Sequence, residues 1–247
     1  MKLYLNLLFL IFLLILFYIL KNKNIEFLYN GNYWNNYRLG DIINGWIYRN
    51  QKGYYNNVSK IYPNSIADLY IKKTKNFKDK ERHNNYKCLN KIIEKKIKDN
   101  KINKLPTKDN IVMHIRVGDS IKNFKNNKFH FIRNNSFGFT LDTYKNMLDT
   151  LYPNKKENKN KKIYLVYGAH MNTNIKFSKL YIKKIKELLK SYNFKIEDYK
   201  SDPDTSYIFM VNSKIYIKGA GGFSKCISKH IKSKGGKVIN PSDYKNK

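Results

Sequence analysis

Short apolar runs alternate with amphipathic stretches along the last third of the chain, and this alternation constrains the fold more than any other feature. The apolar runs of strand length are residues 163–167, 194–196, 214–217 and 237–239. The stretches with helical apolar spacing are residues 174–192, 204–211 and 223–233. Strands that alternate with helices predict parallel βαβ units, which bind ligands at the carboxyl ends of their strands.

Related patterns occur earlier in the chain. Residues 111–115 form an apolar run that predicts a buried strand, and residues 86–102 have the apolar spacing of a helix. Thr140 precedes a second helical pattern over residues 141–151 and is a predicted cap. Residues 153–162 contain no apolar side chain after their proline, which predicts an exposed linker. We therefore expect one domain over residues 25–160 and another over residues 161–247.

The N-terminal segment has the composition of a membrane span. Residues 3–20 carry no charge and only one polar side chain, Asn6, and these 18 residues are long enough to cross a bilayer as a helix. The chain continues through two lysines without a small-residue cleavage site, so an uncleaved signal anchor within residues 1–24 is preferred to a cleaved signal peptide. The flanking positive charges nearly balance, which leaves the orientation open.

The charge of the chain is strongly positive, at +31, and comes from 44 Lys against 5 Arg. Lysines are spread along the whole chain, and lysine is a residue that AT-rich codons encode. Specific nucleic-acid readout depends on the planar fork of arginine, so nucleic-acid binding is a disfavoured alternative. The two cysteines exclude a disulfide scaffold and a multi-cysteine zinc module.

The sequence HIRVGD, residues 114–119, ends the predicted strand 111–115. The carboxyl end of such a strand opens onto the ligand crevice, so Arg116 is placed to pair with a phosphate through two parallel hydrogen bonds. Gly118 lets the backbone approach a ligand, and Asp119 can orient Arg116 or cap the following segment. The structural alternative is an Arg–Asp pair that braces a turn, with His114 as a buried core residue.

The sequence GAGGFS, residues 219–224, joins a predicted strand directly to a predicted helix. Free backbone N–H groups at a helix start bind anions, and glycines allow a phosphate to approach. Ser224 adds a hydroxyl donor. The alternative is a tight turn that needs glycine only for its backbone conformation.

Two further segments are less specific. Arg38, Gly40 and Asp41 form a glycine turn that leads into a predicted helix. Residues 202–204 read DPD, the D-x-D form that holds a metal in one class of glycosyltransferases. They precede a helix here, so we predict a capping role for Asp202 with proline in the first turn, and no metal site.

In this order, the segments resemble the GDP-fucose-dependent fucosyltransferases, whose strand carries H-x-R-x-G-D. The α1,2-fucosyltransferases typically show H-x-R-R-G-D where this chain reads HIRVGD. The family's N-terminal loop is similar to residues 38–41, and its helix with a tyrosine pair is similar to residues 141–148. Its C-terminal S-x-F-S-x-W turn resembles residues 221–226, which read GGFSKC, and its acidic residue matches Asp204.

The resemblance implies a fold and a reaction. The fold would be α/β and GT-B-like, with two facing Rossmann-type halves after the membrane helix. Residues 25–160 would form the acceptor side and residues 161–247 the nucleotide-sugar side. The reaction would be an inverting, metal-independent transfer of fucose from GDP-fucose to a glycan acceptor, with no cofactor. The anchored domain would then be lumenal, as in the Golgi or the ER.

The resemblance also assigns roles to residues. Arg116 would neutralise the diphosphate of GDP and, with Asp119, is a predicted catalytic residue. The residues themselves do not single out a general base among Asp119, Asp41 and His170. The predicted donor-binding residues are His114, Arg116, Gly118, Asp204, Gly221, Gly222, Phe223 and Ser224. Val117 and Cys226 stand where the family has arginine and tryptophan. A non-catalytic membrane-anchored protein with a degenerate transferase fold, or a lysine-rich protein that binds nucleic acid or other anions, is therefore the alternative.

Overall fold

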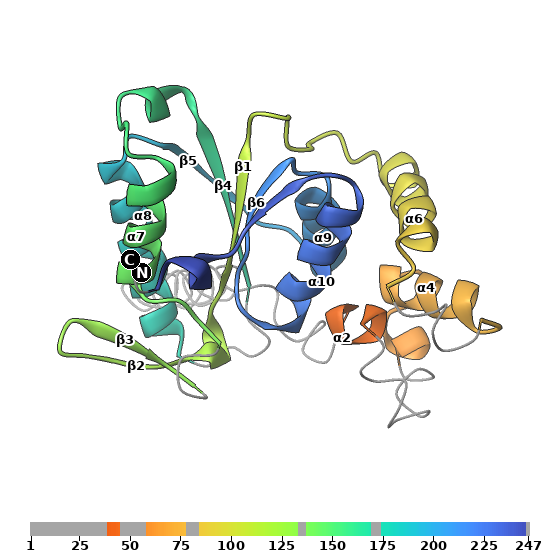
Figure 1. The fold of residues 1–247 in the computed structure, drawn as a ribbon. Helices are drawn as coiled ribbons and strands as arrows, with labels where there is room; N and C mark the ends of the chain where they lie inside the picture. Colours follow the sequence, from red (N-terminus) through yellow and green to blue (C-terminus); the bar gives the residue numbers. More distant parts are fainter. Residues whose placement is uncertain (1–38, 45–57, 78–83, 133–136, 169–173, 246–247) are drawn as a thin grey trace, which may run out of the picture.

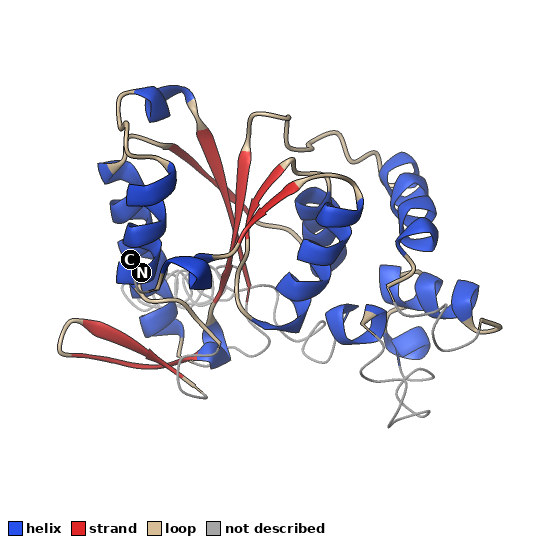
Figure 2. Ribbon diagram, viewed as in Figure 1, coloured by secondary structure: helices blue, strands red, loops and turns tan. Residues whose placement is uncertain are grey.

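A five-stranded parallel sheet forms the centre of the molecule (Figure 1, Figure 2). The computed structural model describes residues 39–44, 58–77, 84–132, 137–168 and 174–245. Across the sheet the strands are β5 (Lys195–Tyr199), β4 (Lys162–Gly168), β1 (Ile111–Arg116), β6 (Ile215–Ile217) and β7 (Lys237–Ile239). An antiparallel hairpin consists of β2 (Ile121–Lys125) and β3 (Lys128–Phe131).

Helices cover both faces of this sheet, as Figure 1 shows. The helices on one face are α7 (Leu141–Leu151) and α8 (Ile175–Ser191), and those on the other are α9 (Pro203–Val211) and α10 (Gly221–Ser233). Outside α9 and α10 lies a further helical layer of α2 (Leu39–Ile43), α4 (Ile66–Thr74) and α6 (Tyr86–Asp99). Short 3-10 turns cover Gly118–Ser120, Glu157–Asn160 and Pro241–Tyr244.

Strand β1 divides the core into two apolar clusters because successive side chains of a strand point to opposite faces. Ile111, Met113 and Ile115 are buried in the cluster that includes α7 and α8. Val112 is buried in the other cluster, together with side chains of α9, α10 and the outer helices. A strand with helices on both faces buries nearly every side chain, which explains the continuous apolar run at residues 111–115.

The order of the strands places a topological switch point beside β1. From β1 the chain proceeds to β4 and β5 on one side, and then crosses to β6 and β7 on the other side. The carboxyl ends of β1 and β6 are therefore neighbours at the point where the strand order reverses. Open parallel sheets bind ligands at this kind of topological switch point.

The prediction of a parallel α/β architecture is confirmed. Helix α7 and strand β7 have the predicted bounds, and Thr140 accepts a hydrogen bond from the Thr143 N–H as the N-cap of α7. Asp202 accepts from the Thr205 N–H, with Pro203 in the first turn of α9, so its predicted capping role is also confirmed.

The described residues do not form the two facing Rossmann-type halves that the resemblance implied. Strand β1 lies before the expected boundary at residue 160, but it pairs with β4 and β6, which lie after that boundary. An apolar strand at the centre of a sheet needs a partner on each edge, and both partners come from the later part of the chain. Residues 153–162 also contain an ordered turn, in which Asn158 is buried and bonded to the Tyr152 carbonyl.

Two expectations concern residues that the structure leaves out. The predicted anchor at residues 1–24 and the side chain of Arg38 lie outside the described residues. Within the described ranges, no helix combines the length and the apolar character that a membrane crossing requires.

Candidate functional site

Arg116 is the last residue of β1 and faces the side of the sheet that α10 covers. Its side chain is 15% exposed, and it is the single arginine within the described ranges. Its Nη2 lies 3.0 Å from Asp119 Oδ2, and its Cζ lies 4.5 Å from the ring centre of Phe137. The carboxylate and the ring hold the guanidinium in one position at the end of the strand.

The turn after Arg116 is anchored to the neighbouring strand and to α8. The Val117 N–H donates to the Gly168 carbonyl at the end of β4, at 3.3 Å. Gly118 has a φ of +75°, a conformation that favours glycine, and its N–H donates to Ser178 Oγ at 2.9 Å. The predicted site residues Arg116, Gly118 and Asp119 therefore belong to one fixed turn at the carboxyl edge of the sheet.

The glycine turn after β6 packs directly against β1. A methyl group added to Gly219 would lie 2.6 Å from both Nδ1 and the carbonyl oxygen of His114. One added to Gly221, whose φ is +89°, would collide with Nη1 of Arg116. The structure thus brings the two predicted segments together, and glycine is required where their surfaces meet.

Helix α10 begins beside Arg116 without a side-chain cap. Its N-cap is Ala220, whose side chain has no oxygen to accept from the N–H groups of the first turn. Those N–H groups and the helix dipole place partial positive charge at the helix start, next to the full charge of Arg116. An anion is the ligand that such an arrangement stabilises.

His114 is buried between the sheet and α10. It is 6% exposed, and its ring lies edge-on to Phe223 at 5.8 Å between ring centres. Burial, together with the neighbouring charge of Arg116, lowers the pKa of His114 to about 3. The ring is therefore neutral at physiological pH, and no partner for its buried Nδ1 exists among the described residues.

Arg116 and Asp119 keep unused hydrogen-bonding capacity. Arg116 Nε and Asp119 Oδ1 are both buried, and neither has a partner in the part of the chain that the structure describes. Buried polar atoms are usually satisfied, so atoms left unpaired need an explanation. A bound ligand or an ordered water would supply the missing bonds.

The predicted N-terminal glycine turn also contacts the start of α10. Gly40 belongs to α2 and lies against the backbone of Gly222 and Phe223 at the start of α10. Asp41 is part of the same helix, while Arg38 and His170 lie outside the described residues.

Asp204 and Ser224, two of the predicted donor-binding residues, make contacts inside the protein. The Asp204 carboxylate accepts from the Ile66 N–H at 2.8 Å and pairs with Lys96 Nζ at 3.1 Å, so it joins α9 to α4 and α6. The Ser224 hydroxyl is fully buried and lies 2.7 Å from the Tyr216 hydroxyl. These contacts give both side chains structural roles that the sequence did not predict.

The sequence missed three contributors to the site. Phe137 lies over the guanidinium of Arg116, and Ser178 fixes Gly118 from the first turn of α8. Asn44, one residue after α2, donates to the Gly222 carbonyl over a long 3.5 Å. A serine in the first turn of a helix that follows a parallel strand was a usable signal, because that turn lies at the same edge of the sheet. The other two contacts depend on tertiary packing.

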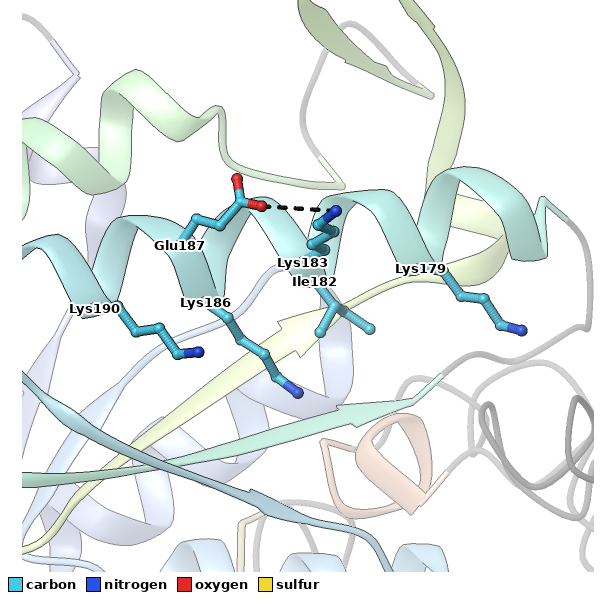
Figure 3. A pocket seen from close by; sticks show the side chains of 6 residues that line it. All are labelled: Lys179, Ile182, Lys183, Lys186, Glu187 and Lys190. Carbon is cyan, nitrogen blue, oxygen red and sulfur yellow. Dashed lines mark ion pairs between the residues drawn. The ribbon is translucent and has the colours of Figure 1, made fainter.

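A separate hollow lies on the surface of α8 (Figure 3). Its lining residues in the described part of the chain are Lys179, Ile182, Lys183, Lys186, Glu187 and Lys190. The Lys183 ammonium lies 4.0 Å from the Glu187 carboxylate, and Lys186 pairs with Asp198 at 2.6 Å. None of the predicted site residues lines this hollow.

Comparisons with known proteins do not assign the chain to a family. No protein-family model matches it, and no curated protein matches it in sequence. Among the described residues, no group of three or more His, Cys, Asp or Glu side chains is placed to hold a metal ion.

Proposed function

We propose that this protein is a glycosyltransferase that binds the diphosphate of a nucleotide-sugar between Arg116 and the first turn of α10. One observation supports this above all. The guanidinium of Arg116 lies against Gly221 at an uncapped helix start, at the switch point of a parallel sheet. The order of motifs along the chain favours GDP-fucose as the donor and a glycan hydroxyl as the acceptor.

The reaction needs electrostatic stabilisation of the leaving group. As the sugar separates from the diphosphate, negative charge grows on the bridging oxygen and the sugar gains positive charge. A fixed cation and oriented N–H groups stabilise that growing charge without having to reorganise. Arg116 supplies the cation, α10 supplies the N–H groups, and Asp119 holds the guanidinium in place. The unpaired Nε of Arg116 provides a further donor.

In this proposal the five-stranded sheet is the nucleotide-sugar side of the enzyme, and the outer layer of α2, α4 and α6 stands towards the acceptor side. The inverting, metal-independent course follows the fucosyltransferase resemblance. Residues 3–20 would anchor the protein in a membrane, with this domain in the lumen.

A non-catalytic anion-binding protein is the second candidate, and two contacts favour it. Asp204 and Ser224, which the resemblance assigns to the donor, are both occupied inside the protein. Such a protein would bind a nucleoside diphosphate without transferring a sugar.

The first experiment measures ligand binding by the full-length chain in detergent. Calorimetric titrations with GDP, UDP, CMP and their sugars should give binding for GDP and GDP-fucose. Arg116→Lys keeps the charge but loses the planar fork, and we expect it to weaken GDP binding by roughly 100-fold, equivalent to about 2–3 kcal/mol of charge-assisted hydrogen bonding. Lys122→Ala removes an exposed charge from the neighbouring strand β2 and should leave the affinity unchanged.

The outcomes separate the candidates. GDP binding together with release of fucosylated glycan, detected by mass spectrometry, supports the transferase. Binding without transfer over a broad glycan panel supports the anion-binding protein. Equal losses in Arg116→Lys and Lys122→Ala, or no binding of any nucleotide, would show that the proposed site is wrong.

A further inference from the structure

Helix α2 and the start of α10 make a backbone-to-backbone contact. A methyl group added to Gly40 would lie 2.6 Å from Phe223 Cα, 2.8 Å from Phe223 N and 2.9 Å from the Gly222 carbonyl carbon. All three atoms belong to the main chain, so rotation of a side chain cannot relieve the overlap. Only glycine at position 40 permits this approach between segments about 180 residues apart in the sequence.

The packing of α2 makes this contact rigid. Leu39, Ile42 and Ile43 are each at most 1% exposed and belong to the same apolar cluster as α10. The Ile43 carbonyl accepts from the Asn84 N–H at 3.0 Å, which ties the end of α2 to the residue before the N-cap of α6. A five-residue helix has little stability of its own, so its position is set by these tertiary contacts.

Two other close approaches lie beside this one. Gly219 packs against His114, and Gly221 packs against Arg116. The first turn of α10 is thus confined on one side by β1 and on another by Gly40. A shift of α2 would therefore change where the N–H groups of this turn point relative to the guanidinium of Arg116.

We propose that Gly40 is a positioning residue of the anion site, through which α2 holds the first turn of α10 in its anion-binding orientation. This inference rests on the proposed function, because it describes how the same site is kept in place. Binding of an anion and docking of α2 onto the start of α10 are reciprocally linked. If docked α2 strengthens anion binding, a bound anion must stabilise docked α2 to the same extent.

The test uses the full-length chain in detergent, with GDP and inorganic pyrophosphate as probes. We expect Gly40→Ala to weaken binding of the probes by at least 10-fold, and Gly40→Val to weaken it further. Ile92→Val is the control, because Ile92 is a 1% exposed residue of α6 in the same cluster and is remote in sequence from α2. It should lower the melting temperature and leave the affinity unchanged.

Hydrogen exchange without ligand supplies a readout that does not depend on the proposed function. In Gly40→Ala, amides at residues 224–227, which make the first hydrogen bonds within α10, should exchange faster, while those in the second half of α10 keep their protection. With wild-type protein, pyrophosphate should slow exchange in residues 39–44. Unchanged exchange at residues 224–227 in Gly40→Ala would overturn the positioning role. The same conclusion would follow if Gly40→Ala and Ile92→Val lost affinity in the same proportion to their loss of melting temperature.

Failure of the proposed function gives a different pattern. If the wild-type protein binds neither probe, the anion site is wrong, whatever the exchange data show. If the wild-type protein binds the probes and Gly40→Ala binds them equally well, the anion site stands and the role of Gly40 is refuted.

Discussion

At the scale of single residues, two glycines at opposite ends of α10 serve different purposes. Gly221 and Gly235 both have positive φ, at +89° and +73°. A methyl group at Gly221 would collide with Arg116, whereas one at Gly235 would meet no atom within 4 Å. Gly235 is therefore needed for its backbone conformation alone, and Gly221 is needed for conformation and for space.

This difference predicts unequal effects of alanine at the two positions. Gly235→Ala should lower the free energy of unfolding by about 1 kcal/mol, the cost of a left-handed conformation. Gly221→Ala should lower it by up to about 1 kcal/mol more, because the methyl group also pushes the end of the Arg116 side chain out of its position. Urea denaturation followed by circular dichroism measures both values. Equal losses would mean that Arg116 is not held against Gly221.

At the scale of elements, Asp204 connects three helices. Its carboxylate at the start of α9 accepts from the first residue of α4 and pairs with Lys96 of α6. Both charged side chains are largely buried, at 6% and 16% exposure. This carboxylate thus attaches two helices of the outer layer to the sheet domain, in addition to the apolar packing.

Asp204→Ala should therefore detach the outer helices. It leaves a buried ammonium and a buried N–H without their partner, so we expect a loss of about 3 kcal/mol in the free energy of unfolding. Limited proteolysis should cut faster between residues 58 and 105. The matched variant Lys95→Ala removes an exposed lysine that pairs with Asp99, and should cost less than about 0.5 kcal/mol. Normal stability in Asp204→Ala would contradict this role.

The sequence predicted the elements whose apolar periodicity is strong. It found β1 and the βαβ series, and it placed Arg116 at the carboxyl end of a buried strand. It missed the β2–β3 hairpin, although Asn126 and Asn127 both have positive φ, the conformation that paired asparagines favour in a two-residue turn. The contact of Gly40 with Phe223 was not predictable, because a single sequence contains no information on which distant segments touch.

At the scale of the whole molecule, two neutral histidines contribute to stability from separate places. His230 lies 2.9 Å from the Tyr207 hydroxyl through Nδ1 and 2.8 Å from Asn90 Oδ1 through Nε2. The asparagine oxygen accepts, so Nε2 carries the proton and Nδ1 accepts from the tyrosine. Burial, with a smaller effect of Lys234, lowers the pKa of His230 to about 3, and burial does the same for His114.

These pKa values predict how stability depends on pH. Between pH 6.5 and 3 the unfolded chain binds more protons at both histidines than the folded protein does. The stability they contribute is complete above pH 6.5 and declines as pH falls, by about 1.4 kcal/mol per pH unit for each ring. Urea midpoints measured from pH 7 down to about 5, above the carboxylate range, should show this slope. His230→Gln should reduce it by about half, and an unchanged slope would contradict the prediction.

The pairing of β1 on both edges also has a consequence for synthesis of the chain. One neighbour, β4, begins at residue 162, but the other, β6, begins only at residue 215 of 247. A nascent chain therefore carries an apolar strand with both edges open until β4 is made, and with one edge open from then until β6 is made. Open strand edges invite pairing with other chains. Until β6 has been made, only the nascent chain itself, a chaperone or a short exposure time can keep that edge from pairing with other chains.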